Sequence, residues 1–338
     1  MKSPRLSELP APVCGKIGWP WAEESHSPLL GHSTIPSFPK ISVVIPSYNQ
    51  GEYLEASIRS ILLQGYPSIE LIIVDGGSSD NSSAIINKYH NWISWWVSEP
   101  DRGQSHAINK GFEHATGDLV TFLSTDDFYL PGTLQDVAHH WADSSTCGAI
   151  IGGFRYLRED GKLSKVRLPV LCRPAPTDLT IGPPGVYRLH QVATFYIRAA
   201  LDEVGRRVRD DLHYTMDREL LYRVCRRFPI HLVNRPYGVF RLHSGSKSTN
   251  SVLAFAKEFE QLYLQMQNGD ESMDERRRWM ARHHRAKGFL KYAKVTTRPF
   301  SAMKSLFQAL RFQPELITRS TYLSAWLEIL RIKRPDPF

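Results

Sequence analysis

The stretch that decides the fold reads Leu119-Val-Thr-Phe-Leu-Ser-Thr-Asp-Asp127, an apolar run followed closely by two adjacent carboxylates. Two similar runs precede it, Ile41-Ser-Val-Val-Ile-Pro46 and Leu71-Ile-Ile-Val-Asp75. Apolar, β-branched runs of this length that alternate with helical patterns indicate buried parallel strands. Because ligands bind such sheets beyond the carboxyl ends of the strands, we expect Asp75, Asp126 and Asp127 to lie at one ligand-binding edge.

The segments around these runs alternate between strand and helix patterns. We expect strands over 41–46, 70–75, 93–97 and 118–123, and helices over 51–64, 81–89, 104–115 and 131–142. This order is typical of an α/β fold, with a doubly wound, mostly parallel sheet flanked by helices. Further along, the patterns predict strands over 149–153, 192–197, 231–233 and 239–242, a hairpin turn at 158–162 and a helix over 214–227. From residue 252 onward the pattern is helical.

Composition divides the chain of 338 residues into three parts. Residues 1–39 are rich in Pro, Ser and Gly and predict a poorly ordered arm, which Trp19 and Trp21 could pin locally. Residues 40–250 form the predicted α/β domain. Residues 251–338 form a basic helical extension, since 16 Lys/Arg against 9 Asp/Glu in 255–338 give +7 of the net charge of +8. Such a tail attracts nucleic acid or an anionic membrane, or is only a solvated helical face.

Several classes of protein are disfavoured by what the sequence lacks. The four cysteines form no CxxC pair, so we expect neither structural zinc nor a disulfide framework, and a reducing, cytoplasmic setting follows. No apolar run approaches the ~18 residues of a membrane span, and we expect no signal peptide. A nucleic-acid partner would explain the basic tail but not the acidic sheet edge.

Trp92, Trp95 and Trp96 form an aromatic cluster, which fits the packing of a strand in the core better than the stacking of a sugar.

The phosphate-binding signatures GxGxxG and GxxxxGK[ST] are both missing from the chain. A phosphate would therefore be held most simply by a divalent cation, Mn²⁺ or Mg²⁺, on Asp126 and Asp127. Two adjacent carboxylates repel each other, and a cation relieves that repulsion. The alternative is a surface turn in which Asp126 caps the helix over 131–142.

Taken together, five segments resemble glycosyltransferase family 2, which has the GT-A fold. They are Val43-Val-Ile-Pro-Ser-Tyr-Asn49, Ile73-Val-Asp-Gly-Gly-Ser-Ser-Asp80, Ser98-Glu-Pro-Asp-Arg-Gly-Gln104, Ala107-Ile-Asn-Lys-Gly111 and Gly117-Asp-Leu-Val-Thr-Phe-Leu-Ser-Thr-Asp-Asp127. The similarity continues more weakly to residue 249 and covers neither 1–39 nor the C-terminal extension. The resemblance implies a nucleotide-binding half over 40–127 and an acceptor half over 128–250.

For the nucleotide half, the resemblance implies a role for each matching residue. The nucleotide base pocket and its surroundings would be lined by Pro46, Tyr48, Asn49, Asp75 and Arg102. Asp126 and Asp127 stand at the family's DxD motif, with Asp127 expected as the main metal ligand because Ser124 replaces the usual first acid. In the second motif, Gly76 replaces the usual second acid.

For the acceptor half, the segment Tyr214-Thr-Met-Asp-Arg-Glu-Leu220 resembles the helix that carries the family's general base. We expect Asp217 as that base, with Glu219 as the alternative; an acid that only complements the helix dipole is the other interpretation. The segment Arg241-Leu-His-Ser-Gly-Ser-Lys-Ser248 resembles a loop that closes over the diphosphate. His243 would ligate the metal, and Arg241 or Lys247 would neutralise the leaving group, unless this is only a surface loop.

The sequence therefore predicts an inverting, metal-dependent glycosyltransferase with a nucleotide-sugar donor and a glycan or lipid-linked acceptor, in surface polysaccharide biosynthesis. A non-catalytic nucleotide-sugar-binding subunit is the alternative. Residues 301–334 interleave apolar and basic side chains, as in amphipathic helices. They predict peripheral contact with the inner face of a membrane, or docking against the catalytic domain or a partner subunit, including another copy of the chain.

Overall fold

The structure is a computed structural model. It describes residues 1–12, 15–25, 37–142, 146–169, 189–247, 251–265, 282, 285–286, 288–290, 292–293, 299–314 and 322. The chain divides into two compact units. The first comprises Met1–Leu179 and Val186–Leu242, and the second comprises Thr180–Gly185 and His243–Phe338.

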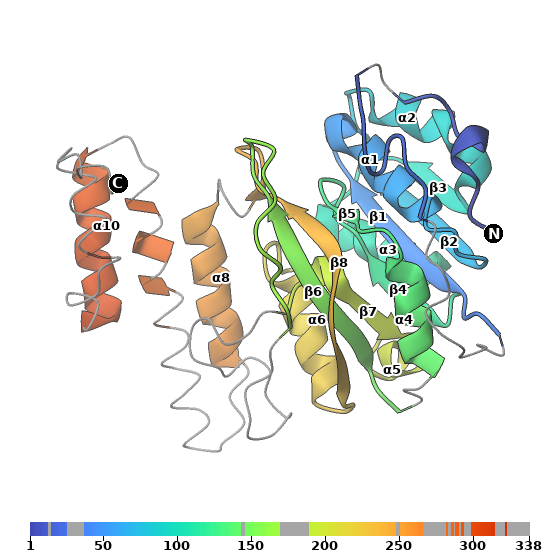
Figure 1. Ribbon diagram of the computed structural model, residues 1–338. Helices are drawn as coiled ribbons and strands as arrows, with labels where there is room; N and C mark the ends of the chain where they lie inside the picture. Colours follow the sequence, from blue (N-terminus) through green and yellow to red (C-terminus); the bar gives the residue numbers. More distant parts are fainter. Residues whose placement is uncertain are drawn as a thin grey trace. The chain divides into compact units, whose positions relative to one another are not determined.

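The first unit is built on an eight-stranded sheet with the order β3-β2-β1-β4-β7-β6-β8-β5 (Figure 1). The parallel part contains β1 (Ile41–Ser47), β2 (Ile69–Asp75), β3 (Trp95–Ser98) and β4 (Leu119–Phe122). It is extended by β7 (Thr194–Ile197), β6 (Ala149–Leu157), β8 (Ile230–Arg241) and β5 (Phe128–Tyr129). The predicted α/β class with a mostly parallel sheet is confirmed. The sheet turns antiparallel where β7 meets β4.

Helices cover both faces of the sheet. The described α-helices of the first unit are α1 (Gly51–Leu62), α2 (Ser82–Lys88), α3 (Gln104–His114), α4 (Thr133–Ala142), α5 (Arg198–Glu203) and α6 (Met216–Cys225). Side chains of β1 alternate between the faces, as the pleat requires. Ile41, Val43 and Ile45 join the core with α1, α2 and α4, whereas Val44 meets Gly111 of α3 so closely that any Cβ there would clash.

One long strand replaces two short ones in the acceptor half. The patterns at 231–233 and 239–242 predict separate strands, but β8 runs unbroken from Ile230 to Arg241. Pro236 lies in its middle and cannot donate a ladder hydrogen bond. The register between β6 and β8 shifts around Gly153, the partner of Pro236, and this irregularity accommodates the proline.

The N-terminal arm differs from the expected poorly ordered segment over residues 1–12 and 15–25. Its backbone carbonyls at Pro10, Pro20 and Trp21 accept hydrogen bonds of 2.9–3.0 Å from the fully buried guanidinium of Arg59. Trp19 donates its indole N–H to the carbonyl of Tyr129 at 2.7 Å. A buried guanidinium requires acceptors, and the arm supplies them.

Glu70 ties the start of β2 to the chain before β4. Its carboxylate accepts hydrogen bonds from Ser42 Oγ (2.5 Å) and from the amide and hydroxyl of Thr116 (2.7 Å each). It also pairs with Lys40 at 2.6 Å. Burial alone would raise the pKa of Glu70, but these hydrogen bonds lower it to about 2.

The tryptophan cluster belongs to the body of the fold. Trp92 and Trp96 pack against the hydrophobic core, as expected, and Trp95 stacks on His114 at 3.7 Å. These three rings therefore take part in the packing of the domain, as the sequence led us to expect in preference to sugar stacking.

The second unit contains α8 (Val252–Gln265) and α10 (Pro299–Phe312). One face of α10 packs Ala302, Leu306 and Ala309 into a small core with Leu290 and Tyr322. In the part of the chain that is described, no helix combines the length and apolar character needed to cross a bilayer.

Candidate active site

The carboxyl ends of β1, β2 and β3 bring three polar residues into one register. Ser47 pairs with Asp75, and Asp75 pairs with Ser98. The fully buried carboxylate of Asp75 accepts hydrogen bonds from Ser98 Oγ (2.6 Å), from Ser78 Oγ (2.5 Å) and from the Ser78 amide (2.9 Å). The sheet thus holds a carboxylate rigidly at the predicted edge.

Tyr48 and Asn49 continue from β1 over this edge. Tyr48 is 61% exposed. Asn49 has a φ of 50°, a left-handed conformation that Asn tolerates, and its side-chain oxygen accepts the Ser79 amide at 2.8 Å. The turn after β1 is therefore fixed against the turn after β2, with the Tyr48 ring open to solvent.

The geometry accounts for Gly76, at the position where the family resemblance led us to expect an acid. A Cβ at this position would lie 2.8 Å from Asp101 Oδ2 and 3.2 Å from the Tyr48 ring. An aspartate here would meet both a steric clash and a like charge. Asp101 itself accepts the Gly103 amide at 2.7 Å, so it shapes the turn before α3.

Asp126 and Asp127 follow β4, as predicted, and both are largely buried (9% and 1% exposed). Asp127 Oδ1 accepts the Arg241 amide at 3.0 Å. Its Oδ2 is buried and has no hydrogen-bond partner among the described residues. Burial raises the pKa of the Asp127 carboxyl well above its usual value, and the charge of Asp126 adds to this shift.

Arg241, at the end of β8, organises the acidic pair from the other side. Its Nε donates to the Asp126 carbonyl at 3.0 Å. Its guanidinium lies over the rings of Tyr53 (5.0 Å) and Phe128 (5.6 Å). A cation is thereby held beside the two carboxylates by contacts from α1, β5 and β8.

The residues present fit a divalent cation only in part. In the described portion of the chain, no three His, Cys, Asp or Glu side chains gather closely enough to hold a metal ion. The orphaned oxygen of Asp127 and the adjacent Asp126 offer two hard oxygen ligands, which suits Mg²⁺ or Mn²⁺ with water and phosphate completing the shell. His243 belongs to the second unit, so its predicted ligand role remains a prediction.

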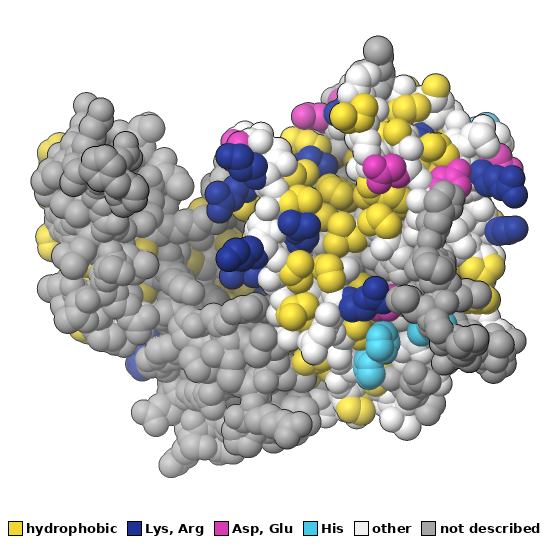
Figure 2. Space-filling model, viewed as in Figure 1, with side chains coloured by type: hydrophobic (Ala, Val, Ile, Leu, Met, Phe, Trp, Pro, Cys, Tyr) yellow, Lys and Arg dark blue, Asp and Glu magenta, His cyan; other side chains and the backbone are white. Residues whose placement is uncertain are grey.

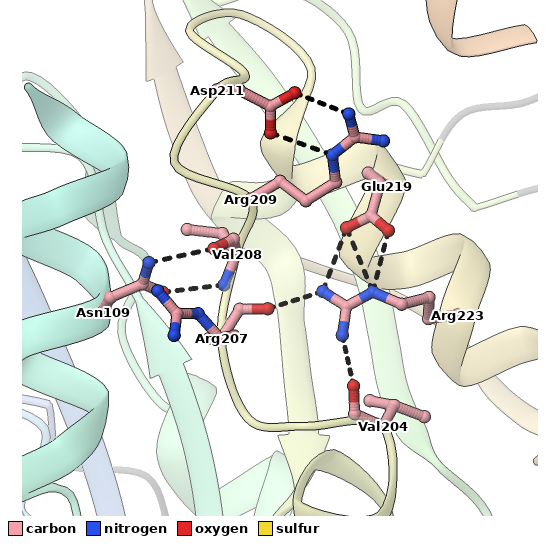
Figure 3. A network of polar contacts seen from close by, with 8 residues as sticks. All are labelled: Asn109, Val204, Arg207, Val208, Arg209, Asp211, Glu219 and Arg223. Atoms are coloured by element: carbon pink, nitrogen blue, oxygen red, sulfur yellow. Dashed lines mark hydrogen bonds and ion pairs between the residues drawn. The ribbon is translucent and has the colours of Figure 1, made fainter. Parts of the chain in front are cut away.

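The two candidate bases of α6 have different surroundings. Glu219 forms an ion pair with Arg223 at 2.8 Å, and Arg223 also donates to the carbonyls of Val204 and Arg207 (Figure 3). Glu219 therefore fastens the loop before α6. Asp217 lies at the N-terminal end of α6. The pKa of Tyr196 is raised, mainly by the burial of its own hydroxyl group and in addition by the charge of Asp217.

Arg102 extends from the turn before α3 and is 72% exposed, 3.9 Å from Asp210. This ion pair is weak in water, so the guanidinium can turn to an anion. The part of the chain that includes Asp210 is held by Asn109, which donates to the Val208 carbonyl and accepts its amide (Figure 3).

Sequence reasoning missed Ser57 and Tyr53 on α1. The fully buried hydroxyl of Ser57 contacts the carbonyls of Thr125 (2.6 Å) and Asp127, which fixes the backbone of the acidic turn. No signal in the sequence pointed to either contact, because the partners of Ser57 and Tyr53 lie about seventy or more positions away along the chain. Ser98 stood in a quoted motif, but its contact with Asp75 was not foreseen.

Comparison with known proteins gives a family match for part of this chain. The model of glycosyl transferase family 2 matches residues 42–205, so these residues form a family 2 glycosyltransferase domain. An uncharacterized glycosyltransferase of Nostoc sp. is 38% identical over 114 residues, which cover 33% of this chain and 35% of the relative. Bacillus subtilis TuaG, named for teichuronic acid biosynthesis, is 33% identical over 36% of this chain and half of its own length.

A solved structure of similar fold is the mannosyltransferase PcManGT from Pyrobaculum calidifontis, in complex with GDP-Man and Mn²⁺. The TM-score is 0.56 at 17% identity, with 88% of this chain and 89% of that chain covered. The fold of this protein is thus GT-A, as the resemblance implied. The chain spans only a third to a half of the two curated relatives, so its whole activity is a matter of proposal.

Proposed function

We propose that this protein is an inverting, metal-dependent glycosyltransferase that moves a sugar from a nucleoside-diphosphate donor to a hydroxyl group. The observation that carries the proposal is the buried Asp127 Oδ2, which lacks a hydrogen-bond partner among the described residues and lies in the turn with Asp126. Such an oxygen calls for a proton or a cation. Its place after β4, in the same sheet as Asp75, fits a metal-bound diphosphate beside a nucleoside pocket.

The nucleoside would bind at the ends of β1 and β2. Pro46, Tyr48, Asn49 and Asp75 would line its base and ribose, and the exposed Tyr48 ring offers a stacking face. Arg102 would meet the nucleotide as a mobile cation.

The cation would be Mn²⁺ or Mg²⁺, held by Asp126 and Asp127. The ligand role of His243, which belongs to the second unit, stays a prediction from the sequence. When bound, the cation would neutralise charge on the departing diphosphate. Arg241 would add a fixed positive charge beside the same group, since Tyr53 and Phe128 restrain its guanidinium.

Asp217 would act as general base by taking the proton of the acceptor hydroxyl. The hydroxyl oxygen then bonds to the anomeric carbon as the bond from that carbon to the diphosphate oxygen breaks, and this single in-line displacement inverts the centre. Glu219 is less suited to this role because Arg223 occupies both of its carboxylate oxygens.

The acceptor would be a glycan or a lipid-linked saccharide in surface polysaccharide biosynthesis, a setting supported by the name of TuaG. The cytoplasmic location, peripheral membrane contact through residues 301–334 and assembly into a homo-oligomer remain predictions. A nucleic-acid partner is not part of the proposal.

The test is a thermal-shift panel of UDP-, GDP-, dTDP- and CDP-sugars, with and without Mn²⁺. One donor should stabilise the protein by ~2.7 kcal/mol at about one hundred times its dissociation constant, in a Mn²⁺-dependent way. Asp126→Asn should lose this stabilisation and Lys2→Gln should keep it. If no donor binds, the proposal fails. Donor binding without release of nucleoside diphosphate across an acceptor panel would favour the non-catalytic binding subunit instead.

A further inference from the structure

We call residues 154–168, a two-stranded hairpin whose first strand is the end of β6, the basic hairpin. Phe154 and Arg167 exchange both backbone hydrogen bonds, at 2.8 and 2.9 Å, and the Arg158 amide donates to the Lys162 carbonyl at 3.1 Å. The tip turns at Gly161, whose φ is +77°. The hairpin is therefore a built ribbon rather than an irregular loop.

The basic hairpin carries a surplus of positive charge. It holds five cations, Arg155, Arg158, Lys162, Lys165 and Arg167, against Glu159 and Asp160, which gives 5 − 2 = +3. All of these cations except the half-buried Arg155 are exposed. Figure 2 shows Lys and Arg side chains gathered at its tip.

Among the residues that the structure describes, most of this charge has no ion-pair partner. Lys162 pairs with Asp160 at 3.6 Å. Arg158, Lys165 and Arg167 make no ion pair with any residue that the structure describes. Cations crowded on one ribbon repel each other and create a positive potential, which favours the approach of an anion.

The tip end of the basic hairpin, where Leu157 bridges to Leu163, lies next to the acidic turn of the candidate site. Leu157 is in register with Arg241, whose amide donates to Asp127 Oδ1 at 3.0 Å. Strand β8 separates the hairpin from β5, which follows Asp127 directly. Two strand spacings amount to about 10 Å, so a chain lying along the hairpin can extend to the donor site.

We propose that the basic hairpin binds an acceptor glycan that carries phosphate or carboxylate groups. This deepens the proposed transferase function and rests on it. The partly exposed Leu163, Val166 and Leu168 (41%, 40% and 36%) lie among the cations and offer apolar contact to sugar rings. A lipid surface fits this ribbon less well, because no fully exposed large apolar side chain is available for insertion.

The test measures binding of two oligosaccharides of equal length, oligogalacturonate and a neutral maltooligosaccharide, by calorimetry without donor. The full chain should bind the carboxylated probe, with affinity that falls as NaCl rises from about 0.05 M to about 0.5 M, and should bind the neutral probe far more weakly. The triple variant R158Q/K165Q/R167Q should weaken binding of oligogalacturonate by about tenfold or more. The charge-matched control K2Q/K16Q/R227Q lies outside the hairpin and should bind like the wild type.

Three outcomes would overturn the proposal: equal binding of both probes, unchanged binding of oligogalacturonate by the hairpin variant, or an equal loss in the control. If the second outcome came with a loss of binding to phosphatidylglycerol vesicles, the hairpin would be a lipid contact instead. Donor-induced thermal shifts should be the same in all three proteins, because the substitutions leave the donor edge intact. A wild type that binds oligogalacturonate but no donor would refute the transferase function and not the anion site.

Discussion

At the scale of single residues, Asp127 shows how a sequence motif and its environment differ. The motif places two carboxylates side by side, which is a local property of the chain. Their inequality is not local, because Arg241 reaches Asp127 Oδ1 from 114 positions away and leaves Oδ2 buried. Burial therefore makes the charge of Asp127 costly in the absence of a cation.

Replacing Asp127 by Asn separates these two properties. In EDTA at neutral pH, the melting temperature of Asp127→Asn should equal or exceed that of the wild type, since the amide keeps the Arg241 contact and removes a costly charge. Turnover and Mn²⁺-dependent donor stabilisation should fall by about a hundredfold. Calorimetry and a nucleoside-diphosphate release assay measure both, and a marked loss of stability in EDTA would contradict the assigned role.

Glu70 makes a second residue-scale prediction, on pH. Its pKa of about 2 in the folded state lies below its ordinary value, so the folded protein holds the proton less tightly than the unfolded chain. Its stabilising contribution is complete above the ordinary value near 4.5 and is lost as the pH falls through about 2. Glu70→Gln should be less stable by about 1–3 kcal/mol at pH 7, with a smaller change on acidification. Urea unfolding from pH 7 to pH 3 tests this, and parallel pH curves would contradict it.

At the scale of elements, α6 carries two acids, and the contacts of one of them, Glu219, show a structural role. Glu219 and Arg223 lie one helical turn apart and fasten the chain at Val204 and Arg207 (Figure 3). The i, i+4 spacing was visible in the sequence, but the two carbonyl partners were not. The helix thus uses Glu219 for its own anchoring, which favours Asp217 for chemistry.

Two substitutions on α6 should consequently behave in opposite ways. Glu219→Gln should lower the free energy of unfolding by about 1–3 kcal/mol, because Arg223 loses its charge partner, while most transfer activity remains at low temperature. Asp217→Asn should keep stability and donor binding and reduce transfer by about a hundredfold or more. Transfer assays and calorimetry on both variants decide the matter, and full activity in Asp217→Asn would exclude it as the base.

At the scale of the whole molecule, the chain joins a GT-A unit to a second, helical unit. The second unit has an unusual surface on α10. Phe300, Met303 and Phe307 share one helical face and are 89%, 36% and 58% exposed. Lys304 and Arg311 border that face, and α10 contains no acidic residue. Exposed apolar and basic side chains of this kind are found on helices that lie in an anionic membrane interface, so membrane contact stays a prediction to be tested.

The membrane prediction is tested by vesicle co-sedimentation. The full chain should bind phosphatidylglycerol vesicles, and F300S/F307S should bind about tenfold more weakly because two aromatic side chains no longer insert. Leu264→Ser, which removes an exposed apolar side chain from α8, serves as the control and should bind like the wild type. Equal binding by F300S/F307S would contradict the prediction and favour protein docking at this face.

The sequence by itself determined the parallel strands, the acidic ends of β2 and β4 and the class of chemistry they suit. These features are carried by short runs whose period and end residues are local. Only the tertiary structure decided that β8 is one bulged strand, that the N-terminal arm serves Arg59, that Arg241 holds the acidic pair and that Glu219 is engaged. Each of these, apart from the spacing of Glu219 and Arg223, depends on contacts between residues far apart in the chain, which no local pattern encodes.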